Sequence, residues 1–269
     1  MLRLAYLLFL CVALAFEGLG QAALKQARAG DRARYATDAQ GAIIRGDISE
    51  KSIALVFTGD EFGDGGPVIL KTLSNNEVHG SFFLTGNFYQ NESFRKLIDN
   101  LKEAGHYLGA HSDKHLLYAD WTRRDSLLVT ENQFTTDLNS NYKRMAAFGI
   151  EKEDAPFFLP PYEWYNATVA AWTRQLGLQL VNFSPGTRSN ADYTYPGMGN
   201  RYVSSEDIYH SIIQYEQEDP HGLNGFILLV HIGTDPRRTD KFYHRLDGLL
   251  KELKSKGYKF VTIRELLEK

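Results

Sequence analysis

The stretch that decides the fold is YLGAHSDKH, residues 107–115. It opens on an apolar run that predicts the end of a buried strand, and it closes on two histidines four residues apart. Imidazoles at this spacing lie on one face of a helical turn or converge in a tight loop, and either arrangement can hold one metal ion. The stretch therefore predicts a strand whose carboxyl end carries a metal-binding pair, His111 and His115.

Two other apolar runs lead into chemically active side chains. Residues 52–57 precede an acidic pair, Asp60-Glu61, and residues 226–230 lead directly into His231. In a parallel barrel the carboxyl ends of the strands meet at one face, where the catalytic residues of barrel enzymes lie. We therefore expect the acidic pair, the two histidines and His231 to share one site, as a metal-dependent hydrolase would require.

The rest of the chain alternates short apolar runs with helical patterns. Apolar side chains recur at helical spacing within residues 94–101 and 246–253. Strands that alternate with helices predict βα units with right-handed crossovers, and hence an α/β fold built on a parallel sheet. Four further strands are expected, at residues 81–85, 157–159, 178–182 and 259–262.

Composition favours a globular enzyme over a nucleic-acid-binding protein. The chain has 269 residues, 43% of them hydrophobic, and a net charge of −3 with both signs interspersed, so no basic stripe offers a surface for nucleic acid. Aromatic residues make up 13% of the chain. Most of them are expected in the core, but this share also suits a cleft in which ring faces stack on sugars.

The first twenty residues have the pattern of a signal peptide. Arg3 precedes thirteen apolar residues, 4–16, which are too few to span a bilayer comfortably, and small residues follow. We predict a cleaved signal peptide over 1–20 and a secreted or periplasmic protein, the alternative being an uncleaved membrane anchor. The single cysteine, Cys11, lies in this segment, so the metal ligands of the mature protein must be histidines and carboxylates.

Domain boundaries follow from periodicity. Residues 21–47 are rich in Ala, Arg and Asp with little periodicity, and we expect a linker or an N-terminal arm there. Residues 48–269 are expected to form one barrel domain.

Several motifs occur in an order that is typical of one enzyme family. The dipeptide GP occurs at residues 66–67, SFFLTG at 81–86, GHYLGAHSDKH at 105–115, LPPY at 159–162 and LVH at 229–231. With these motifs the chain resembles the polysaccharide deacetylase family, the NodB homology domain of carbohydrate esterase family 4. The resemblance implies a distorted (β/α) barrel, one divalent metal ion held by an Asp and two His, and hydrolysis of acetyl groups from a sugar. Zinc suits such a donor set.

The resemblance also implies roles within the predicted site. Asp60, His111 and His115 are expected to bind the metal. Glu61 is expected to be the carboxylate base that takes a proton from water, and His231 the acid that protonates the leaving group.

Substrate contacts are expected from the LPPY turn. The backbone N–H of Tyr162, placed after Pro161, would donate to the developing oxyanion. Trp164, beside the same turn, would stack on a sugar ring.

The acidic motif departs from the family pattern. Where the family has Thr-Phe-Asp-Asp-Gly, Thr58 and Gly59 take the two Asp positions, and the acidic pair is displaced to Asp60-Glu61. Either a bulged loop lets these carboxylates reach back, or the base is lost. Asp64 is a further candidate for the base.

Two supporting residues also change. The family's Arg beside the base is Leu159 here, which fits a displaced base, because a guanidinium without its carboxylate would be a poorly compensated buried charge. The family's Asp that pairs with the acid histidine falls near Gly186, and Asp192 or Asp235 are the candidates to replace it.

The sequence thus predicts a metal-dependent hydrolase that removes acetyl groups from an N- or O-acetylated polysaccharide or oligosaccharide, with no protein partner implied. The competing prediction is a catalytically inactive barrel that keeps the metal and binds carbohydrate. The displaced acidic pair favours the binder. The preserved His111, His115 and His231 favour the enzyme, because a binder has little use for a proton donor.

Overall fold

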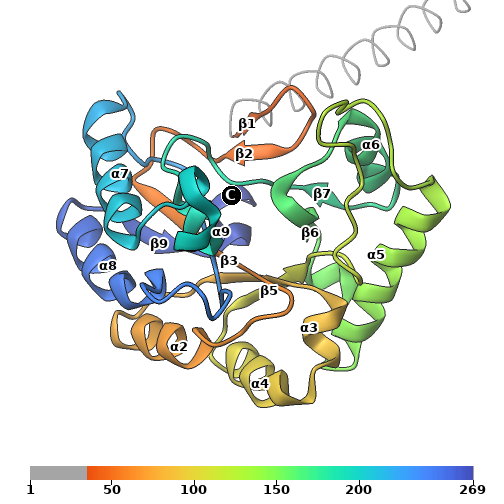
Figure 1. Ribbon diagram of the computed structural model, residues 1–269, viewed down its shortest axis with the longest axis horizontal. Helices are drawn as coiled ribbons and strands as arrows, with labels where there is room; N and C mark the ends of the chain where they lie inside the picture. The colour runs from red at the N-terminus through yellow and green to blue at the C-terminus, as the bar shows by residue number, and fades with distance from the viewer. Residues whose placement is uncertain (1–34, 269) are drawn as a thin grey trace, which may run out of the picture.

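The computed structural model describes residues 35–268, and Figure 1 shows how their helices and strands are arranged. The predicted signal peptide, 1–20, lies outside the described residues, as does part of the predicted arm, 21–47. Among the residues that are described, no helix has the length and apolar character needed to cross a membrane.

One curled sheet forms the centre of the molecule. Its strands run in the order β1-β2-β8-β3-β4-β5-β6-β7, with β9 beside β3. The two ends of this order meet where Ile43 pairs with Val181, and the N–H of Asn182 donates to the carbonyl of Ile43 at 2.8 Å. The strands are β1 (Ala36–Thr37), β2 (Ile43–Arg45), β3 (Ser52–Gly59), β4 (Ser81–Leu84), β5 (Tyr107–Ala110), β6 (Phe157–Phe158), β7 (Gln179–Leu180), β8 (Phe226–His231) and β9 (Lys259–Val261).

Helices surround the sheet (Figure 1). Side chains that accept from otherwise free N–H groups fix where they begin: Thr130 and Gln133 form a capping box at α5, and Asn166 accepts from two N–H groups at α6. The α-helices are α2 (Gly66–Asn75), α3 (Gly86–Gln90), α4 (Arg95–Glu103), α5 (Glu131–Ala146), α6 (Ala167–Gln175), α7 (Ser205–Glu218), α8 (Leu246–Ser255) and α9 (Ile263–Leu267). The 3₁₀ helices are η1 (Glu92–Phe94), η2 (Lys152–Asp154), η3 (Pro161–Glu163), η4 (Ser189–Tyr193), η5 (Pro196–Arg201) and η6 (Phe242–Arg245).

The predicted α/β fold, a distorted (β/α) barrel, is confirmed. Every residue of β3 is buried, which is why this strand is a near-continuous apolar run in the sequence. Side chains fill the inside of the curled sheet, where the ring of Phe83, whose residue pairs with Thr58, packs against that of Tyr107 at 5.8 Å. The centre of the barrel is therefore a packed core, and ligands must bind at its ends.

Part of the stretch expected to be an arm belongs to the sheet. β2 pairs antiparallel with β8, and Ala42 and Ile43 are buried. The folded body thus extends upstream of residue 48, the expected start of the domain. A run of only three apolar residues, 42–44, carries this strand, and it is too short to be recognised from periodicity.

The parallel register brings the carboxyl ends of the central strands to one edge. Loops that leave this edge therefore start side by side, although they are far apart in the sequence. The paired residues at these ends are Thr58–His231, Gly59–Leu84, Leu84–Ala110 and Ala110–Phe158.

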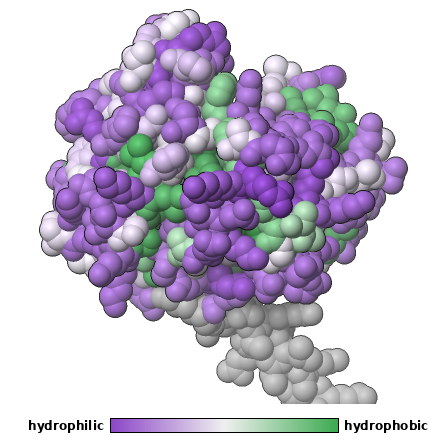
Figure 2. Space-filling view, turned by 90° about the horizontal axis from the view of Figure 1, so that it is seen from below, coloured by the Kyte–Doolittle hydropathy of each residue, from purple (hydrophilic) through white to green (hydrophobic). Residues whose placement is uncertain are grey.

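The outer surface differs in character from this core. Figure 2 shows one face of the molecule, which is mostly hydrophilic and carries apolar residues in separate patches. A surface of this kind is usual for a globular domain, and single exposed apolar residues on it need no explanation.

Candidate active site

A cleft of about 660 Å³ opens at the carboxyl ends of the strands. This volume lies within the range of small-molecule sites. Loops that follow β3, β5, β6 and β8 form its walls together with η4 and η5. Six of the residues predicted from the sequence line it: Asp60, Glu61, His111, His115, Tyr162 and His231.

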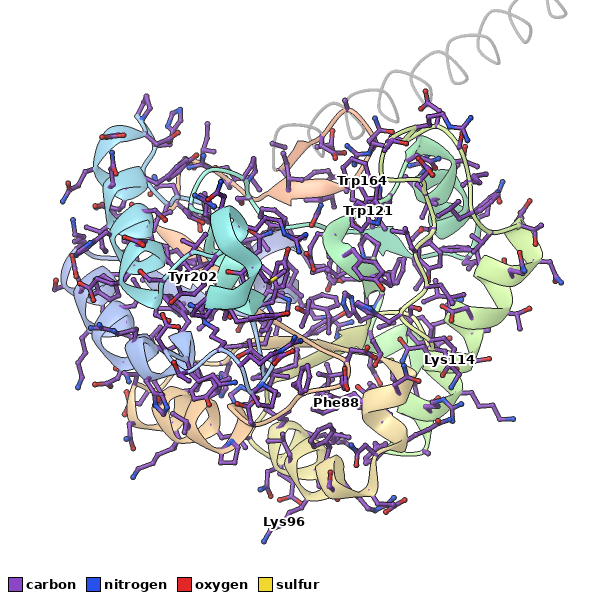
Figure 3. All side chains as sticks on the ribbon, viewed as in Figure 1. Phe88, Lys96, Lys114, Trp121, Trp164 and Tyr202 are labelled. Atoms are coloured by element: carbon purple, nitrogen blue, oxygen red, sulfur yellow. The ribbon has the colours of Figure 1, made fainter. Side chains whose placement is uncertain are left out.

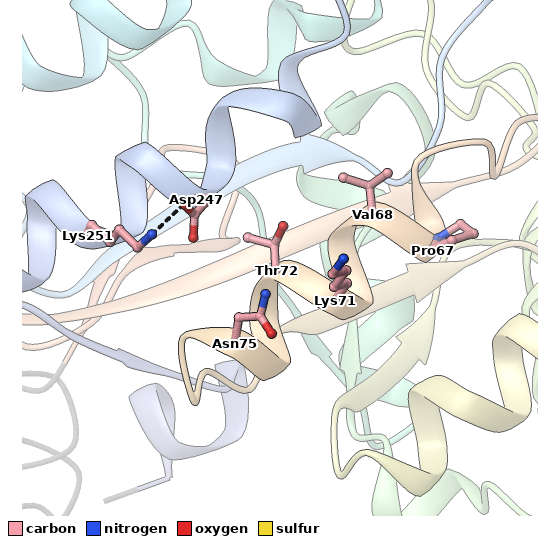
Figure 4. Close-up of a pocket in the computed structure, with 7 residues that line it drawn as sticks. All are labelled: Pro67, Val68, Lys71, Thr72, Asn75, Asp247 and Lys251. Atoms are coloured by element: carbon pink, nitrogen blue, oxygen red, sulfur yellow. Dashed lines mark hydrogen bonds and ion pairs between the residues drawn. The ribbon is translucent and has the colours of Figure 1, made fainter.

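A second hollow, of about 560 Å³, lies between α2 and α8 (Figure 4). Two of its charged residues bind each other: Asp247 binds Lys251 at 2.7 Å and also accepts from the side-chain amide of Asn76 at 2.9 Å. No predicted site residue lines it. The cleft at the strand ends is therefore the candidate active site.

His111 is held as a metal ligand would be. It directly follows β5, and its Nδ1 lies 2.7 Å from the carbonyl oxygen of Leu159. Burial, together with the neighbouring His115, holds the pKa of His111 well below its usual range. The ring is therefore neutral, its Nδ1–H donates to the carbonyl, and Nε2 is left as a donor atom for a metal.

A buried carboxylate shapes the loop that presents His115. Asp137, from α5, accepts hydrogen bonds from the hydroxyl of Ser112 at 2.6 Å, from that of Tyr118 at 2.9 Å and from the N–H of Lys114 at 3.0 Å. Ser112 and His115 both have left-handed backbone, with φ of 76° and 54°. Such conformations are costly for residues other than glycine and persist where the surroundings enforce them. Here the hydrogen bonds to Asp137 hold the loop in this conformation.

The two carboxylates of the displaced acidic pair lie in different environments. Oδ1 of Asp60 accepts from Thr85 at 2.7 Å and from Asn87 at 3.1 Å, and Oδ2 lies 3.9 Å from Nδ1 of His115. Glu61 is exposed and makes no hydrogen bond or ion pair with the described residues. Asp64 accepts from the N–H of Thr234 at 2.9 Å and thus ties this loop to the one after β8.

Close packing explains the displacement. A Cβ atom at Gly59 would lie 2.7 Å from Cγ2 of Ile232 and 2.9 Å from Cδ2 of Leu84. These distances are shorter than real contacts allow, so this backbone has no room for an aspartate. The loop instead places its first carboxylate at Asp60.

The donors fit a metal ion in kind. Two imidazoles whose rings lie 5.2 Å apart face the cleft with one carboxylate, which is a donor set found in catalytic zinc sites. Ligand atoms of a tetrahedral zinc site lie about 3.4 Å apart, and the nitrogen of His115 and the oxygen of Asp60 are 3.9 Å apart. Within residues 35–268 no three His, Cys, Asp or Glu side chains are gathered as a closed metal cluster.

His231 has the environment of a proton donor. Its Nδ1 lies 2.6 Å from Oδ1 of Asp192, and the backbone N–H of His231 donates to Oδ2 of the same carboxylate at 2.9 Å. Burial lowers the pKa of His231, but the charge and hydrogen bond of Asp192 more than offset this, so the pKa is raised. Of the two candidate partners, the structure brings Asp192 to His231, whereas Asp235 binds Arg237.

The three predicted substrate residues have different positions. Tyr162 is 44% exposed in the cleft, with its ring 4.4 Å from that of His115. Pro161 is buried. Trp164 does not line the cleft: its ring stacks on Trp121 at 5.5 Å, side by side in Figure 3, and its Nε1–H donates to the carbonyl of Asp120.

Sequence reasoning missed several residues of the cleft, and two of them bear on its chemistry. Trp121, 54% exposed, lies at the rim in front of Trp164, and its position in the long loop after His115 was the available signal. Glu163 also lines the cleft, and its carboxylate makes no hydrogen bond or ion pair with the described residues. Its position between Tyr162 and Trp164, two residues that the resemblance had singled out, was a signal that went unused.

Comparison with known proteins agrees with this geometry. The family model described as polysaccharide deacetylase matches residues 45–181. The match ends before Asp192 and His231, so the cleft geometry itself brings these two residues to the site.

Three relatives are informative. The peptidoglycan-N-acetylmuramic acid deacetylase PdaA of Bacillus subtilis is 27% identical over 82% of this chain and 73% of its own length. The structure of PdaA superposes with a TM-score of 0.63 at 26% identity, over 85% of this chain and 86% of that one. A peptidoglycan-N-acetylglucosamine deacetylase of Bacillus cereus is 26% identical over 81% of this chain and 89% of its own length. A pseudoenzyme of carbohydrate esterase family 4 from Bacillus anthracis has a TM-score of 0.65 at 18% identity, over 86% of this chain and 70% of that one.

Proposed function

The chain belongs to the polysaccharide deacetylase family, and from this premise we propose that it is a metal-dependent hydrolase that removes acetyl groups from the N-acetylated sugars of a glycan. One observation carries the proposal: the pair His111 and His115 lines the same cleft as His231, which is hydrogen-bonded to Asp192. The first pair offers donors for a metal ion, and the second holds a proton for the leaving group.

Asp60, His111 and His115 would hold the ion, and zinc suits their oxygen and nitrogen donors. When bound, the ion supplies polarisation of the acetyl carbonyl and a water of lowered pKa. The carbonyl of Leu159 fixes His111 so that the other ring nitrogen is free for this purpose.

His231 donates its proton to the nitrogen of the leaving amine as the bond to the acetyl carbon breaks. Asp192 holds the ring in place and stabilises its charged form. The N–H of Tyr162 donates to the oxyanion that forms on the acetyl group, since the turn at Pro161 holds this backbone at the cleft.

Peptidoglycan is the substrate class that we propose. Two of the relatives named above act on its N-acetylmuramic acid or N-acetylglucosamine residues, as their names state. Three exposed aromatic rings, those of Trp121, Tyr162 and Tyr193, line the cleft and offer flat apolar faces to sugar rings.

The predicted leader agrees with this substrate. Residues 1–20 would deliver the protein to the periplasm or the exterior, cleaved as a signal peptide or kept as an anchor. Peptidoglycan lies on that side of the membrane, so the proposed enzyme and its substrate would share a compartment.

A non-catalytic, carbohydrate-binding barrel that retains the metal is the second candidate. Thr58 and Gly59 carry no carboxylate, and Glu61 has no partner among residues 35–268 to orient it. This candidate predicts metal binding and glycan binding without release of acetate.

Acetate release separates the two candidates. Wild type loaded with zinc should release acetate from peptidoglycan or from oligomers of N-acetylglucosamine. His231→Ala should lower turnover by roughly 10²–10⁴-fold, the usual contribution of a general acid. Its metal content should not change, because the role proposed for His231 is that of a proton donor. No acetate from a panel that includes O-acetylated xylan, with fully metallated wild type, would favour the binder.

A further inference from the structure

The proposed reaction needs a carboxylate that takes a proton from water, and the cleft offers few. Asp60 is engaged by two donors and lies near His115, whereas Asp235 is bound by the guanidinium of Arg237. Glu61 is exposed at the mouth. Among the carboxylates that line the cleft, Glu163 alone is both partly buried and free of a hydrogen bond or ion pair with the described residues.

The backbone holds Glu163 in a costly conformation. Its φ of 54° follows the φ of 58° at Tyr162, so two consecutive residues other than glycine are left-handed. The N–H of Glu163 donates to the carbonyl of Pro160 at 3.1 Å, and its own carbonyl accepts from the amide of Asn182 at 3.1 Å. Strain that is fixed from both sides is characteristic of functional sites.

The surroundings of Glu163 also suit proton transfer. Burial raises the pKa of Glu163 to about 7, the charge of His231 counteracts part of this rise, and Asp192 adds to it. The carboxylate thus lies within electrostatic range of the proposed acid. A group with a pKa near neutrality is the most effective general base at neutral pH.

We propose that Glu163 is the carboxylate base of this cleft and takes the place expected of Glu61. This inference rests on the proposed function. Glu163 removes one proton from water as the water oxygen bonds to the acetyl carbon. The bond from this carbon to nitrogen then breaks, and His231 gives its proton to the nitrogen. Acetic acid and a free amine leave, the acid loses the second proton of the water to solvent and becomes acetate, and Glu163 returns its proton through solvent in the cleft to His231.

The test compares Glu163→Gln with two other variants in the full-length zinc-loaded protein. Glu163→Gln should lower turnover by roughly 10²–10⁴-fold with zinc content and circular dichroism unchanged. Glu77→Gln is the matched control, because Glu77 is exposed, has a left-handed φ of 52° and does not line the cleft. Its turnover should stay within about twofold of wild type, since no proton transfer in the cleft depends on it. Glu61→Gln tests the competing assignment, in which Glu61 is the base.

Two further readouts distinguish a base from a merely structural carboxylate. Turnover of Glu163→Ala should recover in part when formate is added, because a free carboxylate can occupy the vacated space. In the pH profile of wild type, turnover should rise through about pH 7 as Glu163 loses its proton, and this limb should be absent in Glu163→Gln.

Each outcome decides a different question. An active Glu163→Gln, or loss of turnover in Glu61→Gln alone, overturns the inference and leaves the proposed function intact. Loss of zinc from Glu163→Gln would make Glu163 a ligand and overturn its role as base. Wild type that releases no acetate from any substrate overturns the proposed function, and the role of Glu163 falls with it.

Discussion

Two loops at the same edge of the barrel serve the cleft, and they are built differently. The histidine loop, residues 111–115, is held by a buried carboxylate, Asp137, through hydrogen bonds to side chains and backbone. In the acid loop, residues 58–64, the second carboxylate, Glu61, makes no hydrogen bond or ion pair with the part of the chain that the structure describes. The donors that we propose for the metal thus lie in a fixed loop, whereas the base that we propose comes from a different loop.

Packing explains why the acid loop has diverged. An added Cβ atom at Gly59 would clash with Ile232 and Leu84, and Oγ1 of Thr58 is buried without a hydrogen-bond partner among the described residues. Neither position can supply a base. The loop after β6 offers Glu163 instead, from the opposite side of the same cleft.

The largest expected difference concerns the metal donors of the two loops. His115→Ala removes a donor atom outright and should weaken zinc binding by at least about 10²-fold, because residues that only support ligands already contribute 10–100-fold. Asp60→Asn keeps an oxygen at the same place and should weaken it less, by about tenfold. Elemental analysis and competition with a chelator measure both. Equal losses would mean that the two loops contribute equally.

The next comparison concerns the anchor of the histidine loop. Asp137→Ala leaves the buried hydroxyls of Ser112 and Tyr118 and two N–H groups without an acceptor, and should lower the free energy of unfolding by about 3 kcal/mol. Zinc should bind less tightly as well. Urea denaturation measures the first effect. Asp120→Ala is the control, since Asp120 accepts three similar bonds in an exposed turn, and its loss should be clearly smaller.

Features that local sequence determines could be predicted, whereas contacts that depend on tertiary packing could not. The pair His111 and His115 and the strand before it could be predicted because spacing and an apolar run fix both. The partner of His231 could be narrowed only to Asp192 or Asp235, because the two lie in separate loops and only packing decides which carboxylate meets the histidine.

The role of Trp121 could not be predicted for a related reason. Trp164 was the expected stacking residue, but a loop more than forty positions upstream folds over it and presents Trp121 to the cleft. Likewise, no spacing rule predicts that a glutamate will adopt a left-handed backbone, so Glu163 could be recognised only from its φ and its surroundings.

The smallest effect is also the one that most sharply separates function from stability. Glu163→Gly should relieve about 1–2 kcal/mol of left-handed strain and cost about 0.5–1 kcal/mol of added freedom in the unfolded chain, a net gain of about 0.5–1 kcal/mol. Glu77→Gly, with the same backbone sign outside the cleft, should give a similar gain. Turnover should fall only in the first variant, because only Glu163 faces the reacting groups. Thermal unfolding and acetate release, measured on both, would show whether the strain at Glu163 is kept for catalysis. If Glu163→Gly is instead less stable than wild type, the side chain of Glu163 stabilises the fold. The acid loop then again becomes the candidate source of the base.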